Sequence, residues 1–202
     1  MKLYYSPGAC SLSPHIVLHE ASGTFEAETV DLGTKRTAAG ADYRAINPKG
    51  AVPALQLDDG QVLTEGSAIV QYLADHKPEA KLAPAAGTLE RYRLQEWLNY
   101  IASEVHKGFS PMFNAKLADE AKQVFKANLA VRFDFLDRNL QAKDYLMGAQ
   151  FSVADAYLFT ILGWTKHFAI DLGQWPGLKA YVERVAARPA VQAALKAEGL
   201  AA

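Results

Sequence analysis

The chain contains a single cysteine, Cys10, which lies where a short apolar run gives way to a predicted helix. The preceding Ser6-Pro7-Gly8 predicts a turn, so Cys10 falls just before the helix N-terminus. There, the positive end of the helix dipole and nearby backbone N–H groups stabilise a thiolate. A lone cysteine is more often a small buried apolar residue, but this position favours a reactive thiol.

The residue three positions after Cys10 is Ser13, so the Cys-x-x-Cys pair of a dithiol oxidoreductase is absent. A single cysteine forms no internal disulfide, and the fold is therefore compatible with a reducing cytoplasm. Disulfide chemistry at Cys10 needs a thiol from another molecule. Glutathione is the natural candidate.

A second candidate position is Val52-Pro53, which follows Gly50-Ala51 and precedes an apolar strand. The Val52–Pro53 bond is either cis or trans, and the residues alone leave both open. In the cis form, the backbone N–H and C=O of Val52 face outward. They can then pair with an extended peptide as an antiparallel strand would.

A third candidate is Thr64-Glu65-Gly66-Ser67, which opens a helix that ends near Asp75. Backbone amides at a helix N-terminus, with the Ser67 hydroxyl, suit a carboxylate, and Glu65 suits an ammonium group. A γ-glutamyl group carries both. Plain helix capping is the alternative interpretation.

In the second half of the chain, Asn99, Ser103 and His106 follow one another at spacings of four and three. In an α-helix this spacing places them on one face, which is unusually polar. Further on, Ser152 and Asp155 form a variant of the capping box, with Phe151 as a hydrophobic staple. We interpret Asp155 as a folding residue.

The elements that position these residues form two domains. Residues 1–80 predict a β-α-β-α-β-β-α order and resemble thioredoxin, with Asp58-Asp59-Gly60 as a hairpin turn. Pro78, Pro84 and Gly87 mark a linker at 81–87. Residues 88–202 predict only helices, over 89–109, 119–140, 153–166, 176–187 and after Pro189. The fold class is thus an α/β domain followed by an all-helical domain.

Composition limits the classes of partner. The 202 residues carry 21 basic and 22 acidic side chains, which gives no electrostatic reason to expect nucleic acid or an anionic membrane. The N-terminal apolar run is too short for a signal peptide, and no stretch of about 18 apolar residues is present. We therefore expect a soluble cytoplasmic protein.

Four segments, SPGACSLSPHIVLHE, NPKGAVPAL, LTEGSAIVQYLAD and FSVADAYLF, are similar in order and spacing to those of bacterial beta-class glutathione S-transferases. The resemblance implies conjugation of the glutathione thiolate to small hydrophobic electrophiles, a role in detoxification, and a homodimer. Glutathione is then a co-substrate, and no cofactor or metal is expected.

The resemblance also assigns roles to residues. It implies a cis bond before Pro53, contact of Lys35 with the glycine carboxylate of glutathione, and a hydrogen bond from His106 near the Cys10 sulfur. Ser103 and Glu104 are expected to meet the γ-glutamyl end from the partner subunit. Cys10 and His106 form the expected catalytic pair. The expected glutathione-binding set is Cys10, Lys35, Val52, Pro53, Glu65, Gly66, Ser67, Asn99, Ser103, Glu104 and His106.

Three questions stay open at this point. Cys10 either donates a hydrogen bond to the glutathione sulfur or forms a mixed disulfide with it. Any of Tyr4, Tyr5 and Ser11 could line the pocket. A non-catalytic binding protein is the alternative from another functional class. The acceptor pocket is expected to lie between Cys10 and a helical face bearing His106, Phe109, Phe113, Trp164, Thr165, His167 and Phe168.

Overall fold

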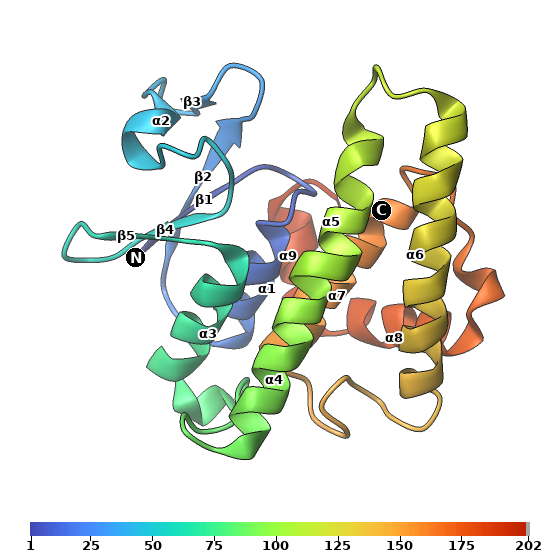
Figure 1. Ribbon diagram of the computed structural model, residues 1–202. Coiled ribbons are helices and arrows are strands. Elements are labelled where there is room, and N and C mark those ends of the chain that lie inside the picture. Colours follow the sequence, from blue (N-terminus) through green and yellow to red (C-terminus); the bar gives the residue numbers. More distant parts are fainter. Residues whose placement is uncertain (201–202) are drawn as a thin grey trace. The chain divides into compact units, whose positions relative to one another are not determined.

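A computed structural model describes residues 1–200 and divides the chain into two compact units. One comprises Met1–Ala83 together with residues 187–200, and the other comprises Pro84–Ala186. This division differs from the predicted limits of 1–80, 81–87 and 88–202. The reason is that the last helix, α9 (Pro189–Ala197), packs against α1 (Leu12–Glu20) in the first unit. Figure 1 shows the two helices side by side.

The first unit is built on a five-stranded mixed sheet with the order β3-β2-β1-β4-β5. β1 (Lys2–Tyr5) pairs in parallel with β2 (Glu26–Asp31) and antiparallel with β4 (Ala54–Gln56). β5 (Val62–Thr64) adds antiparallel to β4, and β3 (Arg36–Thr37) adds antiparallel to β2. The thioredoxin-like fold is confirmed. The two-residue β3 is too short to leave a sequence pattern and was not predicted.

Helices complete the first unit. α1 buries Ile16 and Val17 completely, and Pro14 lies in its first turn, where a missing N–H does no harm. α2 (Tyr43–Ile46) is capped by the preceding Asp42, whose side chain accepts a hydrogen bond from the Arg44 N–H. The remaining helices of this unit are α3 (Gly66–His76), the 3₁₀ turn η1 (Pro78–Ala80) and α9.

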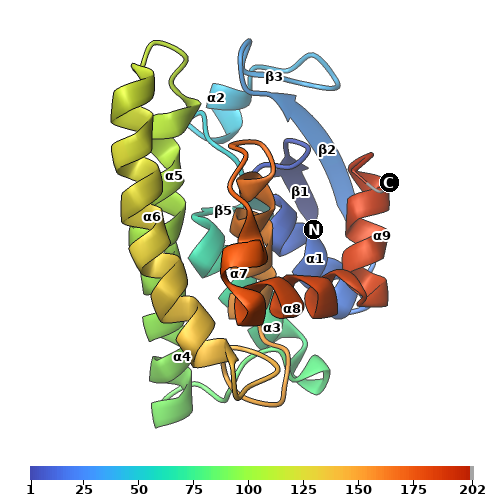
Figure 2. The same cartoon turned by 90° about the vertical axis from the view of Figure 1, so that its right-hand side faces the viewer.

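The second unit is helical, as predicted. Its elements are α4 (Leu89–Tyr100), η2 (Ile101–His106), α5 (Lys107–Phe109), η3 (Ser110–Phe113), α6 (Asp119–Leu140), α7 (Val153–Leu162), η4 (Gly163–Thr165), η5 (Leu172–Gln174) and α8 (Pro176–Ala186). In Figure 2, α4 and α5 run as one rod, and α6 returns beside them.

The rod from α4 to α5 is not a uniform α-helix. Its middle segment η2 is π-helical, and the Lys107 N–H donates to the Ala102 carbonyl five residues earlier. A π turn is wider than an α turn and often marks a functional site. The predicted single helix over 89–109 therefore contains a change of pitch at the polar residues.

α7 forms the centre of the helical unit, because all ten of its residues are buried. Its predicted capping box is confirmed: Asp155 Oδ2 accepts from the Ser152 N–H at 2.8 Å and from the Ser152 hydroxyl at 2.7 Å. Asp155 Oδ1 accepts from the Leu146 N–H and the Tyr181 hydroxyl. Burial raises the pKa of Asp155, and these four hydrogen bonds satisfy its carboxyl group.

Within residues 1–200, no helix has both the length and the apolar character needed to cross a membrane.

Candidate functional site

The Cys10 thiol lies beside the Val52 carbonyl. Its Sγ donates to the Val52 oxygen at 3.2 Å, and the side chain is half-buried. α1 begins two residues later, so the predicted location before a helix N-terminus is confirmed. Because a carbonyl oxygen only accepts hydrogen bonds, this contact is made by the protonated thiol.

Hydroxyl groups hold the turn that carries Cys10. The Ser11 hydroxyl accepts from the Ser6 N–H at 3.1 Å and donates to the Ser6 carbonyl at 3.2 Å. The Ser13 hydroxyl donates to the Cys10 carbonyl at 3.0 Å. Ser11 occupies the N-cap position, but its side chain makes no capping bond. Neither hydroxyl caps α1, because both bond to backbone of the turn instead.

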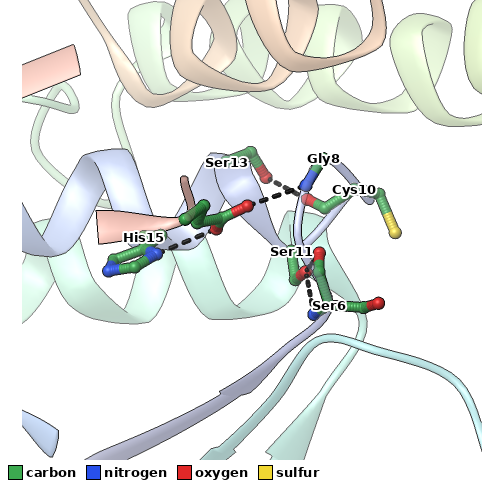
Figure 3. A network of polar contacts seen from close by, with 7 residues as sticks. Ser6, Gly8, Cys10, Ser11, Ser13 and His15 are labelled. Atoms are coloured by element: carbon green, nitrogen blue, oxygen red, sulfur yellow. Dashed lines mark hydrogen bonds and ion pairs between the residues drawn. The ribbon is translucent and has the colours of Figure 1, made fainter. Parts of the chain in front are cut away.

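A buried carboxylate from the far end of the sequence also supports this turn. Glu198 Oε2 accepts from the Gly8 N–H at 2.8 Å, and Glu198 Oε1 lies 2.9 Å from His15 Nδ1. Gly8 has a φ of +71°, which favours glycine. Figure 3 shows this network, with the Cys10 side chain pointing away from His15. The carboxylate thus holds the turn through Gly8 and His15, and the thiol of Cys10 takes no part in these hydrogen bonds.

The Val52–Pro53 peptide bond is cis, as the resemblance implied. The preceding loop is fixed through the Ala51 carbonyl, which accepts from the Tyr43 hydroxyl at 2.9 Å and from Asn47 Nδ2 at 2.7 Å. Burial raises the pKa of Tyr43 to about 12, so its hydroxyl remains a donor. In the described chain, the Val52 N–H has no acceptor.

The N-terminus of α3 lies next to the cis proline. Ala54 and Thr64 are paired across β4 and β5, and a Cβ added at Gly66 would come within 3.9 Å of Pro53 Cγ. Glu65 has a φ of +72°, an uncommon conformation for a residue with a side chain. Such backbone positions cluster at ligand sites.

The polar groups at the start of α3 are accessible. The Glu65 carboxylate is 71% exposed and forms an ion pair with Lys49 Nζ. The N–H groups of Ala68 and Ile69 donate to the Glu65 carbonyl. No acceptor among residues 1–200 takes the N–H groups of Gly66 and Ser67, so both remain available to an anion.

Lys35 contacts the loop that precedes Val52. Its Nζ donates to the Gly50 carbonyl at 2.9 Å, and its backbone has a φ of +58°. The residue is half-buried, whereas loop lysines are usually solvated. The first unit therefore brings together Cys10, Lys35, Val52–Pro53 and the start of α3.

Tyr4, Tyr5 and Ser11, which the sequence offered as alternatives for lining the pocket, all stabilise the fold of the first unit. Tyr4 is buried and donates to Gln56 Oε1 at 3.1 Å, and Ser11 bonds to Ser6. The Tyr5 ring packs 5.1 Å from His15. Burial raises the pKa of Tyr5, and the Glu198 carboxylate adds to this shift, which disfavours a tyrosinate.

In the helical unit, the π turn sends its polar side chains in two directions. His106 Nδ1 lies 2.7 Å from the Tyr157 hydroxyl on α7. Ser103 instead donates to the Asn99 carbonyl at 2.9 Å, and Glu104 forms an ion pair with Arg132 on α6 at 2.9 Å. Of the expected polar face, Asn99 and Ser103 thus bond to each other and are exposed, whereas His106 contacts α7.

Ser103 and Glu104 border a cavity of about 220 Å³ in the helical unit. The cavity is lined by Ser103, Glu104, Lys107, Gly108, Phe125, Asn128, Leu129 and Arg132.

Aromatic side chains of the helical unit form one cluster. Trp164 lies 5.8 Å from Phe109 and 5.1 Å from Phe113, edge to face in both cases. Phe113 also contacts Phe168 and stacks on His167, and it is 50% exposed. Thr165 is buried and donates to the Leu162 carbonyl, so it stabilises the turn. The other predicted acceptor residues in this unit gather in this cluster.

Comparison with known proteins agrees with this geometry. Residues 8–76 match the family model of the glutathione S-transferase N-terminal domain, and residues 100–189 match that of the C-terminal domain. Glutathione S-transferase GstA of Escherichia coli O157:H7 is 48% identical over 200 residues, which cover 99% of this chain and all of the relative. The chain belongs to the glutathione S-transferase family.

Two solved structures narrow the likeness within the glutathione S-transferases. A beta-class enzyme from Sphingomonas chungbukensis is 52% identical, with a TM-score of 0.96 over 99% of this chain and all of that one. A sphingomonad glutathione S-transferase complexed with glutathione is 50% identical, with a TM-score of 0.96 over the full length of both. The predicted beta-class resemblance is confirmed.

Several supporting residues were missed by the sequence reasoning. The Asn47-Pro48 turn could have pointed to Asn47, because asparagine often bonds to backbone two residues on. Glu198 lies 183 residues from His15, and no local pattern links them. Tyr157 was not singled out, because it lies in a helix of mainly apolar residues. Within the described residues, no cluster of three histidine, cysteine or acidic side chains is arranged to hold a metal.

Proposed function

We propose that this chain is a glutathione transferase that conjugates the glutathione thiolate to small hydrophobic electrophiles and so detoxifies them. The observation that carries this proposal is the meeting of three ligand-suited positions in the first unit. These are the Cys10 thiol against the Val52 carbonyl, the cis Pro53, and the N–H groups at the start of α3 that have no acceptor among residues 1–200.

Glutathione fits this surface as an extended peptide. Its cysteinyl group would pair with the backbone of Val52, whose N–H has no acceptor in the described chain. Its γ-glutamyl carboxylate would receive the N–H groups of Gly66 and Ser67, with Glu65 on the ammonium group. The glycine carboxylate would lie toward Lys35, which is held beside the same loop.

Cys10 acts in this proposal as a hydrogen-bond donor. Its S–H already points at a carbonyl oxygen, and a bound thiolate sulfur would offer a stronger acceptor. The glutathione sulfur then attacks an electrophilic carbon: a C–S bond forms, the leaving group departs with its electron pair, and the thiol proton passes to solvent. Each unit by which the site lowers the pKa of the glutathione thiol corresponds to about 1.4 kcal/mol of stabilisation of the thiolate.

A panel of halogenated aromatics, epoxides, peroxides and disulfides tests the activity. We expect glutathione conjugation with at least one carbon electrophile, and Cys10→Ala should keep most of it. Glutathione binding by calorimetry without activity on any member of the panel would contradict the proposal and point to a binding protein.

A second function, thiol–disulfide exchange, is favoured by one observation: the half-buried Cys10 has no second cysteine to resolve it. The Cys10 thiolate would attack a glutathione disulfide, form a Cys10–glutathione mixed disulfide and release the other thiolate. A second glutathione would regenerate Cys10. Mass spectrometry before and after reductant tests this, because an adduct must appear in the wild type and be absent from Cys10→Ala.

We further propose a cytoplasmic homodimer in which His106 acts on the thiolate, Asn99 contributes to glutathione binding, and Ser103 and Glu104 meet the γ-glutamyl end of the partner's glutathione. Large apolar side chains exposed in the helical unit support an interface, among them Leu89 at 66% and Val131 at 60%. Asn99 and Ser103 are also exposed. Light scattering should give twice the mass of one 22.0 kDa chain, and the mass of a single chain would contradict the dimer.

A further inference from the structure

The hydroxyl group of Tyr157 and the ring of His106 form a short, enclosed contact inside the helical unit. Tyr157 is 4% exposed on α7, and its oxygen lies 2.7 Å from His106 Nδ1. Trp164 packs on the same imidazole at 4.9 Å with the rings inclined by 71°. The imidazole is thus fixed at Nδ1 by Tyr157 and contacted on its ring by Trp164.

The chemistry of the two groups sets the direction of this hydrogen bond. A neutral imidazole has one N–H donor and one bare nitrogen acceptor, whereas a phenol both donates and accepts. The phenol O–H is the more acidic donor, and the bare imidazole nitrogen is the more basic acceptor. The favourable arrangement therefore places the donor on Tyr157 and the acceptor on His106 Nδ1.

The surroundings of His106 keep the ring uncharged. Burial lowers the pKa of His106 to about 4, and the neighbouring Lys107 ammonium adds to this shift. The ring is therefore neutral at pH 7. With Nδ1 occupied as an acceptor, its single proton must be on Nε2.

We propose that Tyr157 is a positioning residue that donates to His106 Nδ1 and thereby fixes the single proton of the neutral imidazole on Nε2, so that Nε2–H is the hydrogen-bond donor that His106 offers. This inference rests on the proposed function. It gives His106 a role different from that of a general base, because the nitrogen that carries the proton cannot accept the thiol proton.

The tautomer can be measured without substrate. Long-range ¹H–¹⁵N spectra of protein labelled at its five histidines distinguish a protonated nitrogen from a bare one, and His106→Gln assigns the signals. We expect a pyrrole-like Nε2 and a pyridine-like Nδ1 at pH 7. A His106 ring protonated on Nδ1 would overturn the proposal.

Two variants of α7 test the cause. Tyr157→Phe removes the hydroxyl and keeps the ring, and we expect the Nδ1 signal to move and both tautomers to appear. Thr160→Val is the matched control. The Thr160 hydroxyl is also buried on α7, but it donates to the Ala156 carbonyl. Unchanged His106 signals in Tyr157→Phe, or equal shifts in both variants, would overturn the assignment.

Kinetics test the consequence for the reaction. We expect Tyr157→Phe to lower kcat roughly 3- to 10-fold, the range for one lost hydrogen bond, with the KM for glutathione nearly unchanged. His106→Gln keeps an N–H donor and should retain more activity than His106→Ala. Equal loss in the two His106 variants would overturn the donor role. No loss in either would refute the proposed function of His106, and the tautomer would still be decided by the spectra.

Discussion

The two units present their candidate groups in different ways. In the first unit, the ligand-suited groups are mainly backbone atoms: the Val52 amide groups and the N–H groups of Gly66 and Ser67. In the helical unit, they are side chains, namely His106 and the aromatic cluster around Trp164.

This difference changes which residues are informative. A backbone group survives substitution of its own residue, so the first unit depends on side chains that hold its loops from behind, such as Asn47 and Glu198. A side-chain group is lost with its residue, so the helical unit depends on the presented residues themselves. Substitutions in the two units test this difference.

The largest effect is expected from Glu198→Ala. The change removes the carboxylate that accepts from the Gly8 N–H and lies beside His15, and the contact with His15 is buried. We expect a loss of about 2–4 kcal/mol in the free energy of unfolding and a raised KM for glutathione. Urea denaturation and kinetics measure both. Glu198→Gln keeps an acceptor and a donor, so it should lose much less; an equal loss would contradict the role of these two hydrogen bonds.

Asn47→Ala comes next, because it removes one of the two hydrogen bonds to the Ala51 carbonyl beside Val52 and leaves only that from the Tyr43 hydroxyl. The expected result is a loss of about 1–2 kcal/mol in stability, with a several-fold rise in the KM for glutathione. Asn114→Ala is the matched control: Asn114 also accepts from the N–H two residues on, but in the helical unit. If both variants raise this KM alike, the loop-support argument is wrong.

The pH dependence of stability should distinguish His106. Its folded pKa of about 4 lies below the ordinary 6.5, so the unfolded chain binds the proton first as the pH falls. The contribution of the neutral His106 ring to the free energy of unfolding is complete above pH 6.5. About 1–2 kcal/mol of it is lost as the pH falls toward 4. Urea titrations at pH 7 and 4.5 should show a smaller drop for His106→Gln than for the wild type. A parallel drop in both proteins would refute this account.

Phe113→Ala should change the reaction more than the fold. The ring is half exposed at the rim of the aromatic cluster, so its removal should cost under about 1 kcal/mol of stability. We expect a 3- to 10-fold rise in the KM for an aromatic electrophile, since one aromatic contact is worth about 0.5–1.5 kcal/mol. The KM for glutathione should stay constant. A change in the KM for glutathione instead would contradict the separate roles of the two units.

The smallest effect is expected from Lys49→Ala. The Lys49–Glu65 pair is exposed on both sides, and such pairs contribute under about 1 kcal/mol. Thermal unfolding should therefore change little. A loss comparable to that of Asn47→Ala would show that this pair, rather than the backbone, holds the start of α3.

Much of the fold followed from local patterns. Cys10 before α1, the Asp58-Asp59-Gly60 hairpin and the Ser152–Asp155 box each depend on neighbours within a few residues, and the structure has each of them. The start of α6 at Asp119 and its end at Leu140 were also predicted.

Other features could not be predicted because their causes are distant or cooperative. The contact of Glu198 with Gly8 joins residues 190 positions apart, and the packing of α9 on α1 has no local signal. The π turn is another case: the α-helical spacing of Ser103 and His106 gives no sign of the hydrogen bond from the Lys107 N–H to the Ala102 carbonyl, nor of the contact between His106 and Tyr157.

The dependence of the Cys10 turn on Glu198 sets an order of events during synthesis. When residues 1–83 have left the ribosome, the sheet can form, but the carboxylate that fixes Gly8 has not yet been translated. The turn acquires its hydrogen bonds to Glu198 only after residue 198 has emerged. Nascent chains released before that point would therefore hold the thiol on a turn that lacks these two hydrogen bonds.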